Sequence, residues 1–600
     1  MPPDSDAPHG APARLRPVRE GAFTTHDGVS LFYRHWPATL PRRGAILLLH
    51  RGHEHSGRMA HLVDELDLPA FDFYAWDSRG HGRSPGARGD APSVGTIVRD
   101  LDTFSAHIAR VHGVAVGDQA VVAQSVAAVV CAAWVHDVAP RLRAQVLASP
   151  AFDVRLYVPL ARPGLALLRR WRGNFFVTSY VKAKLLTRDP ARQAGYDADP
   201  LIAKSISVNI LLGLHDTARR VVADSHAIVV PTQLLVSGAD WVVKQAPQHA
   251  FFERLSSPVK ERHVFETFLH DTLGERDRAP AVGRVRDFLL RAFDTPAAAP
   301  DLAGLDRAGV AHDEAAALAR ALPWWTPRGL YWTLARASIR LGASLSDGLR
   351  IGRETGHNSG SMLDYVYRDE ASGAGPLGRL ADRRYLDAPG WRGIRQRKAH
   401  LEELVRLAIG RLRAANRPVR LLDIAAGHGR YVLDAIAASP TRPDAIVLRD
   451  VEPRHVDAAR ALIRERRLAD IARSETGDAF DRDALAAVSP RPTLAIVSGL
   501  YELFGDNAAV ARSLAGLAAA IEPGGLLVYT NQPWHPQLEL IARTLTHPDG
   551  SPWVMRRRTQ AEMDALVRRA GFEKEATRVD EGGLFTVSLA RRVDAAGPDS

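Results

Sequence analysis

Three residues far apart in the chain have the types and the order of a catalytic triad. Ser125 follows the apolar run QAVVAQ and precedes VAAVVCAAWV, Asp240 follows TQLLVSGA, and His270 follows HVFETFL. A histidine takes the proton of a serine hydroxyl during attack on an ester, and a carboxylate holds the imidazole in the required tautomer. The pattern therefore predicts ester cleavage by Ser125, with His270 as the base and Asp240 as its orienting acid.

The residues around Ser125 favour a sharp strand–turn–helix. Such a turn needs small residues two positions before and after the serine, usually glycines, because neighbouring backbone comes close. Here alanine stands at both positions, in AQSVA (123–127), and alanine is the next smallest residue. We predict an oxyanion hole made by the N–H of Val126, at the start of the helix, and that of Gly52, in HRGHEHSGR (50–58).

Over about residues 22–293 the chain resembles the monoacylglycerol lipase and lysophospholipase group of the α/β-hydrolases, the serine-aminopeptidase-like family. HRGHEHSGR is similar to that family's H-G-x-G-E-H-S-x-R, and DSRGHGRS (77–84) to its D-x-R-G-H-G-x-S. The resemblance implies an α/β-hydrolase fold, an acyl-serine intermediate and a monoacylglycerol- or lysophospholipid-like ester. The family has glycine where this chain has Arg51, and we expect the arginine to crowd the acyl pocket.

Short apolar runs between helical patterns predict a parallel sheet covered on both faces. The predicted strands are GAILLLH (44–50), FDFYAWD (71–77), AVVAQS (120–125), AQVLASP (144–150), IVVPTQLLVSGAD (228–240) and HVFETFLH (263–270). A helical insertion over about 157–224 interrupts this rhythm, as a lid would. Its segment 160–186 mixes apolar residues with Arg and Lys, which fits either a cap on the hydrolase body or a face for peripheral membrane contact.

A second motif with a possible chemistry of its own is LLDIAAGHGRY (421–431), which reads as strand, turn and helix. Small residues stand where backbone must approach a ligand. A dinucleotide fingerprint needs a third glycine, and that position is Val432. The turn instead resembles the first motif of class I S-adenosylmethionine-dependent methyltransferases, which implies S-adenosyl-L-methionine as cofactor. The residues implied to bind it here are Asp423, Ala425, Gly427 and Gly429.

Further strand ends agree with that resemblance, which covers about residues 400–592. Asp450 ends the run AIVLRD about 20 residues after the turn, where an acidic group accepts hydrogen bonds from a ribose, and Glu452 is a less suitable substitute. The resemblance places Asp478, in GDAF, beside the adenine amino group. Segment 363–398 resembles the helical lead-in of a bacterial methyltransferase subfamily often fused to such hydrolases. The acceptor-side candidates are Tyr501, Glu502, Trp534 and His535.

Length and composition bound these interpretations. The chain has 600 residues and a formal net charge of +10, but its basic residues are scattered, so we expect no nucleic-acid partner. More than one domain is expected at this length. The single cysteine, Cys131, lies in an apolar run and is consistent with a reducing compartment, the cytoplasm. No signal peptide, membrane span or metal site is predicted.

The predicted fold class is α/β, with an N-terminal α/β-hydrolase fold that carries a helical lid and a C-terminal Rossmann-like class I methyltransferase fold. The predicted segments are a disordered tail (1–21), the hydrolase domain (22–293, lid about 157–224), a linker and helical lead-in (294–397), the methyltransferase domain (398–592) and a tail (593–600).

Two functions remain open at this point. The chain is either a bifunctional ester hydrolase and methyltransferase of unknown acceptor, or a methyltransferase with a catalytically silent hydrolase-fold binding or targeting module. The alanines beside Ser125 and the presence of Arg51 motivate the second. Trp324, Trp325 and Trp332, with the basic helix after them, fit either interdomain packing or membrane docking.

Overall fold

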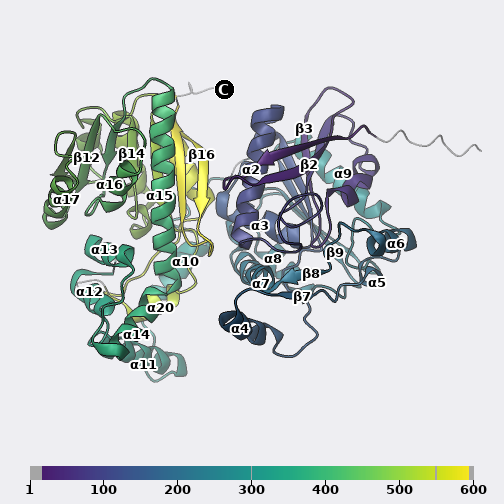
Figure 1. Cartoon of the computed structure of the whole chain (residues 1–600), viewed down its shortest axis with the longest axis horizontal. Helices are drawn as coiled ribbons and strands as arrows, with labels where there is room; N and C mark the ends of the chain where they lie inside the picture. The colour runs from purple at the N-terminus through teal and green to yellow at the C-terminus, as the bar shows by residue number, and fades with distance from the viewer. Residues whose placement is uncertain (1–15, 299, 358, 547–550, 594–600) are drawn as a thin grey trace, which may run out of the picture. The chain divides into compact units, whose positions relative to one another are not determined.

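The computed structural model describes residues 16–298, 300–357, 359–546 and 551–593. The chain divides into two compact units, Met1–Pro300 and Asp301–Ser600. Figure 1 shows the first unit in purple to teal and the second in teal to yellow, each built around its own sheet.

An eight-stranded sheet in the order β1-β2-β4-β3-β5-β6-β9-β10 forms the first unit. Strands β1 and β2 pair antiparallel with each other, β2 pairs antiparallel with β4, and the remaining neighbours are parallel. The strands are β1 (Arg19–Thr24), β2 (Ser30–Trp36), β3 (Gly44–Leu49), β4 (Phe71–Trp76), β5 (Gln119–Gln124), β6 (Ala144–Ala148), β9 (Thr232–Ser237) and β10 (Lys260–Phe265). This is the α/β-hydrolase sheet that the resemblance implied.

Helices cover both faces of this sheet, which explains why every residue of β3, β4, β5, β6 and β9 is buried. On one face α1 (Ala60–Glu65) and α9 (Ala279–Asp294) close an apolar core. The other face packs against α3 (Val126–Val138), which in turn contacts α2 (Val94–His112) and α7 (Val208–Ala223). Helix α8 (Ala246–Arg254) contacts α7.

The edge of the sheet differs from the prediction. β1 begins at Arg19, within the segment predicted as a disordered tail, and β2 was not predicted at all. β1 is mostly exposed and buries only Phe23, whereas β2 alternates, because these strands at one side of the sheet lack the continuous apolar run of a central strand. The prediction was also wrong about His270, because β10 ends at Phe265 and His270 lies in the loop that follows.

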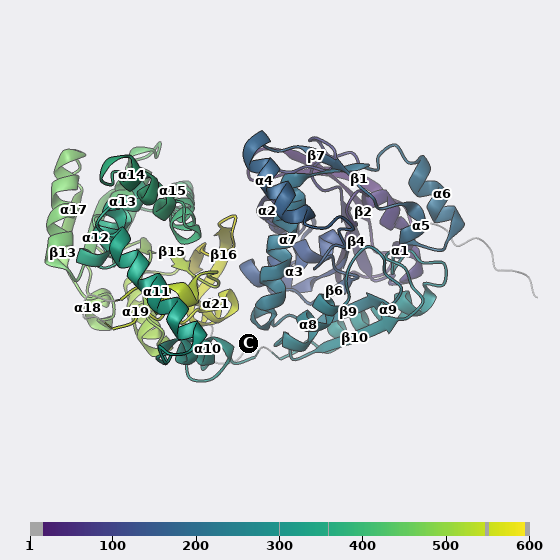
Figure 2. The same cartoon turned by 90° about the horizontal axis from the view of Figure 1, so that it is seen from below.

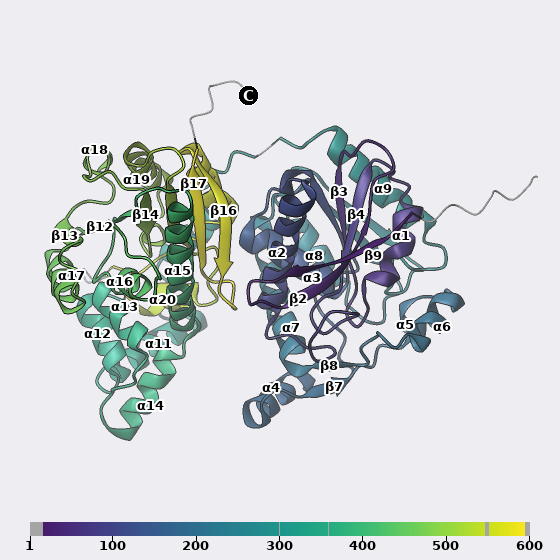
Figure 3. The same cartoon turned by 45° about the horizontal axis from the view of Figure 1, so that its top comes forward.

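The insertion between β6 and β9 consists of α4 (Ala161–Arg172), β7 (Phe176–Thr178), α5 (Ala183–Leu186), α6 (Pro190–Ala198), β8 (Ser205–Ser207) and α7. It is largely helical, as predicted, but β7 and β8 also pair as a small antiparallel sheet. Figure 3 shows α4, β7 and β8 gathered at one end of the first unit. Helix α4 has no buried residue, whereas α7 buries six.

Seven strands in the order β13-β12-β11-β14-β15-β17-β16 form the sheet of the second unit. The first five are parallel, and β17 runs antiparallel to both of its neighbours. They are β11 (Arg420–Asp423), β12 (Ala445–Asp450), β13 (Ala472–Thr476), β14 (Leu494–Val497), β15 (Leu526–Asn531), β16 (Phe572–Val579) and β17 (Thr586–Arg592). The order reverses beside β11, and in Rossmann-like sheets a ligand crevice forms at such a point.

Two apolar cores sandwich this sheet. The helices α15 (Pro389–Ala414), α16 (Arg430–Ala437) and α17 (Pro453–Glu465) cover one face, and α19 (Asn507–Ala520) and α21 (Gln560–Arg569) the other. The second unit also contains two short helices, α18 (Arg482–Ala486) and α20 (Leu538–Thr544). The antiparallel pair β16–β17 was not predicted from the sequence.

In the second unit, five helices lie before α15, in the region where a helical lead-in was predicted. They are α10 (Val310–Ala319), α11 (Pro327–Gly342), α12 (Asp347–Thr355), α13 (Gly360–Arg368) and α14 (Gly375–Leu386). Figure 2 shows them in teal within the second unit. Buried Asp382 on α14 holds α12 and α13 against it, because its carboxylate accepts hydrogen bonds from the N–H groups of Gly348 and Ser372 and from the Tyr365 hydroxyl. Within the described residues no helix is both long and apolar enough to cross a bilayer.

Two candidate active sites

Ser125 lies at the turn between β5 and α3 in a strained backbone conformation. Its φ is +55° and its ψ is −115°, a region that costs a non-glycine residue about 1–3 kcal/mol and persists only where the surroundings impose it. The surroundings here are hydrogen bonds: the Ser125 N–H donates to Ala148 (2.9 Å), and the Ser125 carbonyl accepts from the Ala151 N–H (3.1 Å). The turn therefore closes with alanine, not glycine, on both sides of the serine.

A continuous chain of hydrogen bonds joins the three predicted triad residues. The Ser125 Oγ atom lies 2.8 Å from His270 Nε2, and His270 Nδ1 lies 2.8 Å from Asp240 Oδ2. A carboxylate only accepts, so Nδ1 carries a proton and Nε2 is left to accept the serine proton. The three side chains are buried, with relative exposures of 5%, 3% and 4% for Ser125, His270 and Asp240.

Asp240 is held ionised by its partners. Burial alone would raise the pKa of this carboxyl, but the charge and hydrogen bond of His270 and two backbone N–H groups lower it overall. Those N–H groups belong to Val242 (2.7 Å) and Val243 (3.0 Å) and both donate to Oδ1. The second oxygen is thereby left for His270, which fixes the ring orientation.

Gly52 and Val126, the two predicted oxyanion donors, lie side by side next to Ser125. A Cβ atom built on Gly52 would stand 2.9 Å from Val126 Cγ2. Within the described part of the chain, neither N–H group makes a hydrogen bond to a backbone carbonyl. Val126 is the first residue of α3, where the N–H has no partner inside the helix. Both donors are therefore available to a ligand.

These groups open into an apolar cavity of about 690 Å³. Ser125, His270, Gly52 and Val126 are among the residues that line it. The insertion supplies much of the remaining wall, including Leu156, Leu165, Leu168, Val177, Ile206 and Leu211. Arg51, which we expected to crowd the acyl pocket, also lines the cavity, and its guanidinium is paired with Glu54 (2.6 Å).

The second site begins at the turn after β11. Gly427 and Gly429 both have positive φ, +54° and +71°, and a Cβ on Gly429 would stand 2.6 Å from Leu448 Cδ1. Glycine is therefore favoured at both positions for backbone conformation, and a side chain at position 429 would also have to displace Leu448. Together with Ala425, these residues line a cavity of about 510 Å³.

Two predicted carboxylates line the same cavity. Asp450 ends β12 and accepts hydrogen bonds from the N–H groups of Gly427 and Glu452, both at 2.9 Å, and from His455 Nδ1 at 3.1 Å. Burial alone would raise the pKa of Asp450, but these three partners lower it. Asp478 follows β13, is exposed, and accepts from the Phe480 N–H at 2.8 Å.

Comparisons with known proteins match this two-part arrangement. Residues 285–592 match a family model described as "Putative methyltransferase", and residues 41–277 match one described as "Serine aminopeptidase, S33". The Escherichia coli (strain K12) "Uncharacterized protein YnbC" is 52% identical over 577 residues, which is 96% of this chain and 98% of that protein. The chain belongs to this putative methyltransferase family. Its N-terminal unit is a serine aminopeptidase-type α/β-hydrolase domain, and its C-terminal unit is the methyltransferase domain.

Lipases are among the relatives of the hydrolase domain. "Monoacylglycerol lipase" of Mycolicibacterium smegmatis is 23% identical over 45% of this chain and 96% of its own length, and mouse "Monoglyceride lipase" is 24% identical over 45% and 88%. Among solved structures, Paleococcus ferrophilus monoacylglycerol lipase (23% identity, TM-score 0.39) covers 46% of this chain and 99% of that one.

Asp423, the remaining residue predicted to bind the cofactor, is not among the residues that line the cavity of the methyltransferase domain. Its carboxyl is fully buried and accepts hydrogen bonds from the Tyr431 hydroxyl and the Ala425 N–H. Burial raises the pKa of Asp423 to about 7, and the nearby charge of Asp450 acts in the same direction. Asp423 thus lies behind Tyr431, which does line the cavity.

Residues of the lead-in line the cavity as well, and sequence reasoning did not assign them to the site. They are Ser359, directly before α13, and Gly360, Leu363, Asp364 and Tyr367 along α13. A Cβ on Gly360 would stand 3.4 Å from the Gly427 Cα. Asp364 binds Arg430, the first residue of α16. The sequence offered one signal for this helix, Ser359 as an N-cap residue. A cap predicts where a helix begins, but it does not predict which residues the helix contacts.

The four acceptor-side candidates lie elsewhere. Tyr501 is fully buried and bonds to Ser513 (2.9 Å), Glu502 pairs with Arg397 (3.5 Å), and none of the four is among the cavity-lining residues. Trp534 packs under Arg557, and His535 lies against Gly390. At the exit of β14, Ser498, Gly499 and Leu500 line the cavity of the methyltransferase domain.

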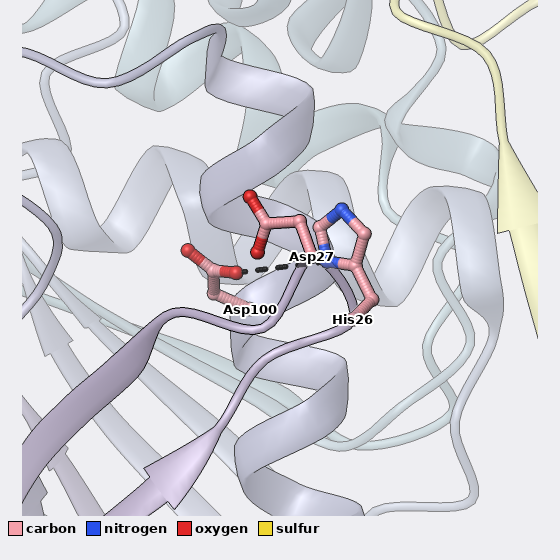
Figure 4. Close-up of side chains that lie close together, drawn as sticks. All are labelled: His26, Asp27 and Asp100. Carbon is pink, nitrogen blue, oxygen red and sulfur yellow. Dashed lines mark ion pairs between the residues drawn. The ribbon is translucent and has the colours of Figure 1, made fainter.

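One cluster in the hydrolase domain has metal-ligand residue types, His26, Asp27 and Asp100 (Figure 4). Arg79, in the DSRGHGRS motif, donates to both carboxylates, at 2.8 Å to Asp27 and 2.9 Å to Asp100. Its hydrogen bond lowers the pKa of Asp27, whereas burial raises the pKa of Asp100 to about 6. The cluster is therefore an ion pair that joins the β1–β2 turn to α2.

Proposed function

We propose that the chain is a bifunctional enzyme, a serine ester hydrolase joined to an S-adenosylmethionine-dependent methyltransferase. The observation that carries the hydrolase half is the hydrogen-bonded chain from Ser125 through His270 to Asp240 at the end of an apolar cavity. The methyltransferase half rests on the glycine turn and Asp450, which face one cavity in the domain of that family.

In the proposed hydrolysis, Ser125 Oγ attacks the ester carbonyl carbon while its proton passes to His270 Nε2. The carbonyl oxygen becomes an oxyanion, for which the N–H groups of Gly52 and Val126 are the proposed donors. The carbon–oxygen bond to the alcohol then breaks, and His270 gives its proton to the leaving oxygen. Water attacks the acyl-Ser125 ester by the same route in reverse, releasing the acid and restoring the serine. Asp240 stays ionised and stabilises the imidazolium.

An ester with an apolar acyl chain is the proposed substrate class. The cavity wall built by the insertion is aliphatic, so a hydrocarbon chain buried there gains the free energy of leaving water. The curated relatives named as monoacylglycerol and monoglyceride lipases support the same class.

The alternative is a silent hydrolase domain that only binds or targets. The alanines beside Ser125 motivated it, but the turn closes with them and keeps the Ser125–His270 hydrogen bond. Labelling with a fluorophosphonate probe separates the two, because only an activated serine reacts. The experiment for the active form follows hydrolysis of nitrophenyl esters of increasing acyl length by the wild type and Ser125→Ala. No turnover of any ester and no labelling would establish the silent form.

The methyltransferase cavity fits S-adenosylmethionine on chemical grounds. Gly427 and Gly429 keep the turn free of side chains, and a ligand can approach the backbone there. Asp450 and Asp478 are acceptors for hydroxyl and amino groups, and ionised Asp450 complements a cationic ligand. When bound, the cofactor supplies a methyl group on a sulfonium centre. Gly427 and Asp450 would hold the nucleoside end, and Asp478 the adenine amino group.

The chain's contribution to methyl transfer is binding and alignment, because holding donor and acceptor in line supplies much of the rate. Titration of the full chain with S-adenosylmethionine tests the donor half directly. If the folded wild-type protein does not bind S-adenosylmethionine, the proposed methyltransferase activity is refuted. The methyl acceptor is proposed to approach beside Gly499 and Leu500, where the exit of β14 faces the cavity.

Peripheral contact with an anionic lipid surface is proposed for α4 of the insertion. Leu165 and Leu168 line the cavity, whereas Leu167 and Trp171 are 72% and 91% exposed on the same helix. Arg169, Arg170 and Arg172 stand beside them at its C-terminal end. An amphipathic helix with basic and aromatic residues binds anionic membrane surfaces, where a lipid ester would also be found.

A further inference from the structure

Helix α11 of the second unit has its apolar side turned outward. Of its 16 residues only Gly329 is buried. Leu330, Leu334 and Leu341 are 50%, 60% and 73% exposed, and their spacing of four and seven residues places them on one side of the helix. A helix of a globular domain normally packs this side on the core. The described residues of the second unit thus leave the leucine side of α11 uncovered.

Polar contacts on the opposite side fix α11 in this orientation. Arg328 Nε donates to Glu539 Oε1 at 3.0 Å, and Arg336 Nε donates to the carbonyl oxygen of Arg543 at 3.1 Å. Both partners belong to α20, and Trp332, which stands between the two arginines in the chain, is half-buried. Residues four apart share one side of a helix, so this is the side that faces α20. The leucine side cannot turn inward without breaking these contacts.

Helix α14 adds further exposed leucines. Leu377 and Leu380 are 74% and 59% exposed, and three buried residues spaced four apart mark the other side of this helix. The Ala374 N–H, directly before α14, donates at 2.9 Å to the carbonyl of Leu345, which follows α11 and is 43% exposed. Figures 1 and 3 show the two helices together at one end of the second unit. The exposed leucines of α11 and α14 therefore gather at that end.

Aromatic residues of the kind found at membrane interfaces accompany these leucines. Trp324 and Trp325, directly before α11, are 70% and 71% exposed, and Tyr331 is 62% exposed. Trp and Tyr collect where lipid meets water, because the ring is apolar while its N–H or O–H group stays in the wet headgroup layer. Together with the exposed leucines and arginines of α11 and α14, these aromatic residues are called the outer face.

The charges that the two helices expose are all positive. Helix α11 has three arginines and no Asp or Glu, and the only acid of α14, Asp382, is fully buried. Arg340, Arg379 and Arg384 are exposed on the same two helices. Arginines beside a convex apolar stripe complement the phosphates and acyl chains of an anionic bilayer. A second copy of the same face would instead bring like charges together.

We propose that the second unit docks on an anionic lipid bilayer through the outer face. This contact is separate from that of α4 and requires neither active site, so it goes beyond the proposed function. Helix α12 contacts both α14 and α13, and α13 lines the cavity of the methyltransferase domain. The helices that form one wall of that cavity are thus part of the docked region.

A local fluorescent probe tests the contact in the full chain. Leu334→Cys is labelled with a nitrobenzoxadiazole dye, and because the native Cys131 is fully buried, the label goes to position 334. With phosphatidylglycerol vesicles at low salt the dye emission is expected to shift to the blue, and with phosphatidylcholine vesicles to stay unchanged. The same label at Ala438→Cys, exposed at the end of α16, is the control and should not respond. The label at position 334 should still respond in the background Leu167→Ser/Trp171→Ser, which excludes α4 as the cause.

Two double variants separate the apolar from the charged contribution. Leu341→Ser/Leu377→Ser should lower the vesicle partition coefficient about 10-fold, because less apolar surface leaves water on docking. Arg340→Gln/Arg384→Gln should lower it about 10-fold at low salt and less at high salt, where the charges are screened. Val310→Ser, exposed on α10, is the matched control and should bind as the wild type does. Circular dichroism verifies the fold of each variant.

Other occupants of the outer face give different results. A dye at position 334 that does not respond to phosphatidylglycerol vesicles, although the protein sediments with them, would overturn the inference. A dye that is already blue-shifted without vesicles would show that protein covers the face. A shift that grows with protein concentration would identify a second copy, and a constant shift would identify the hydrolase unit. Either result would overturn docking on lipid.

Discussion

His136 Nε2 lies 2.7 Å from Asp224 Oδ2, and this buried pair fastens the insertion to the helix that begins after Ser125. His136 is on α3, and Asp224 directly follows α7. Burial alone would lower the pKa of His136, but hydrogen bonds and charge from Asp137 and Asp224 raise it. Arg220, on α7, adds a second link through Asp137 at 2.8 Å. Because α7 is anchored and α4 buries no residue, α4 is the part of the insertion free to meet a surface.

Membrane contact through α4 is testable by sedimentation with vesicles. Wild-type protein is expected to bind phosphatidylglycerol vesicles at low salt, and the double variant Leu167→Ser/Trp171→Ser to bind several-fold less, since apolar burial and charge act together. Leu40→Ser, which also removes an exposed leucine but lies far from α4 in the sequence, is the control and should bind as the wild type does. Equal sedimentation of wild type with and without anionic vesicles would exclude the contact.

Ser125→Ala is expected to lower ester turnover by at least about 10³-fold, because the nucleophile is lost while binding groups remain. The measurement is nitrophenyl ester hydrolysis together with fluorophosphonate labelling, with circular dichroism to verify the fold. Ser78→Ala, which removes another hydroxyl from the cavity wall, is the control and should retain labelling. Unchanged turnover in folded Ser125→Ala would remove Ser125 from the mechanism.

Asp240→Asn tests the orienting role separately from the nucleophile. An amide keeps the shape but reverses one hydrogen bond, so His270 would take the wrong tautomer, and kcat is expected to fall by about 10⁴-fold. The partners of Asp240 lower its pKa, so in the wild type this carboxylate remains ionised at neutral and mildly acidic pH. Activity of Asp240→Asn close to wild type at pH 7 would contradict the assignment.

Asp450→Asn is expected to weaken S-adenosylmethionine binding by about 10- to 100-fold, because a charged acceptor is replaced by a neutral one. Asp450→Ala should abolish binding, since the Gly427 N–H also loses its partner. Glu452→Gln is the matched control two residues away and should bind normally. If Glu452→Gln loses affinity and Asp450→Asn keeps it, the ribose assignment belongs to Glu452.

Asp423 makes the stability of the methyltransferase domain depend on pH. Its folded-state pKa of about 7 lies above the unfolded value near 4, so the folded state holds the proton more tightly. The unfolding free energy should therefore fall as pH rises from about 4 to about 7 and level off above that. Hydrogen exchange of a peptide covering β11, corrected for the intrinsic rate, measures this. Asp423→Asn should abolish the dependence, and the exposed Asp444→Asn should retain it.

The sequence predicted the central strands of the hydrolase sheet because local pattern determines them. The types and chain order of Ser125, Asp240 and His270 were also read from the sequence, and the structure places the three within hydrogen-bond distance. GAILLL and FDFYAW are continuous apolar runs and became β3 and β4. Strand β1 was not predicted because its sequence, REGAFT, is short and mostly polar. The end of the strand before His270 was misplaced because the apolar residues continue past Phe265 into the loop.

Contacts between distant residues could not be predicted in the same way. The pairing of Arg51 with Asp271 joins opposite ends of the hydrolase domain, and a sequence pattern gives residue types but not partners. Asp423 was predicted to bind the ligand from its place in the motif, but its neighbour Tyr431 covers it. The pairing of Asp364 with Arg430 could not be predicted either, because it depends on how the helical lead-in packs against the turn after β11.

The ion pair between Asp364 and Arg430 has a consequence for dissecting the protein. One wall of the donor cavity comes from α13 and the glycine turn from the segment after β11, so the smallest piece that keeps the pocket whole must include α12 and α13. A fragment beginning at the start of the sheet would retain all seven strands yet expose the cavity on the α13 side. The shorter fragment is therefore less suitable for expression. A fragment of the second unit is better begun before α10, in the linker after α9.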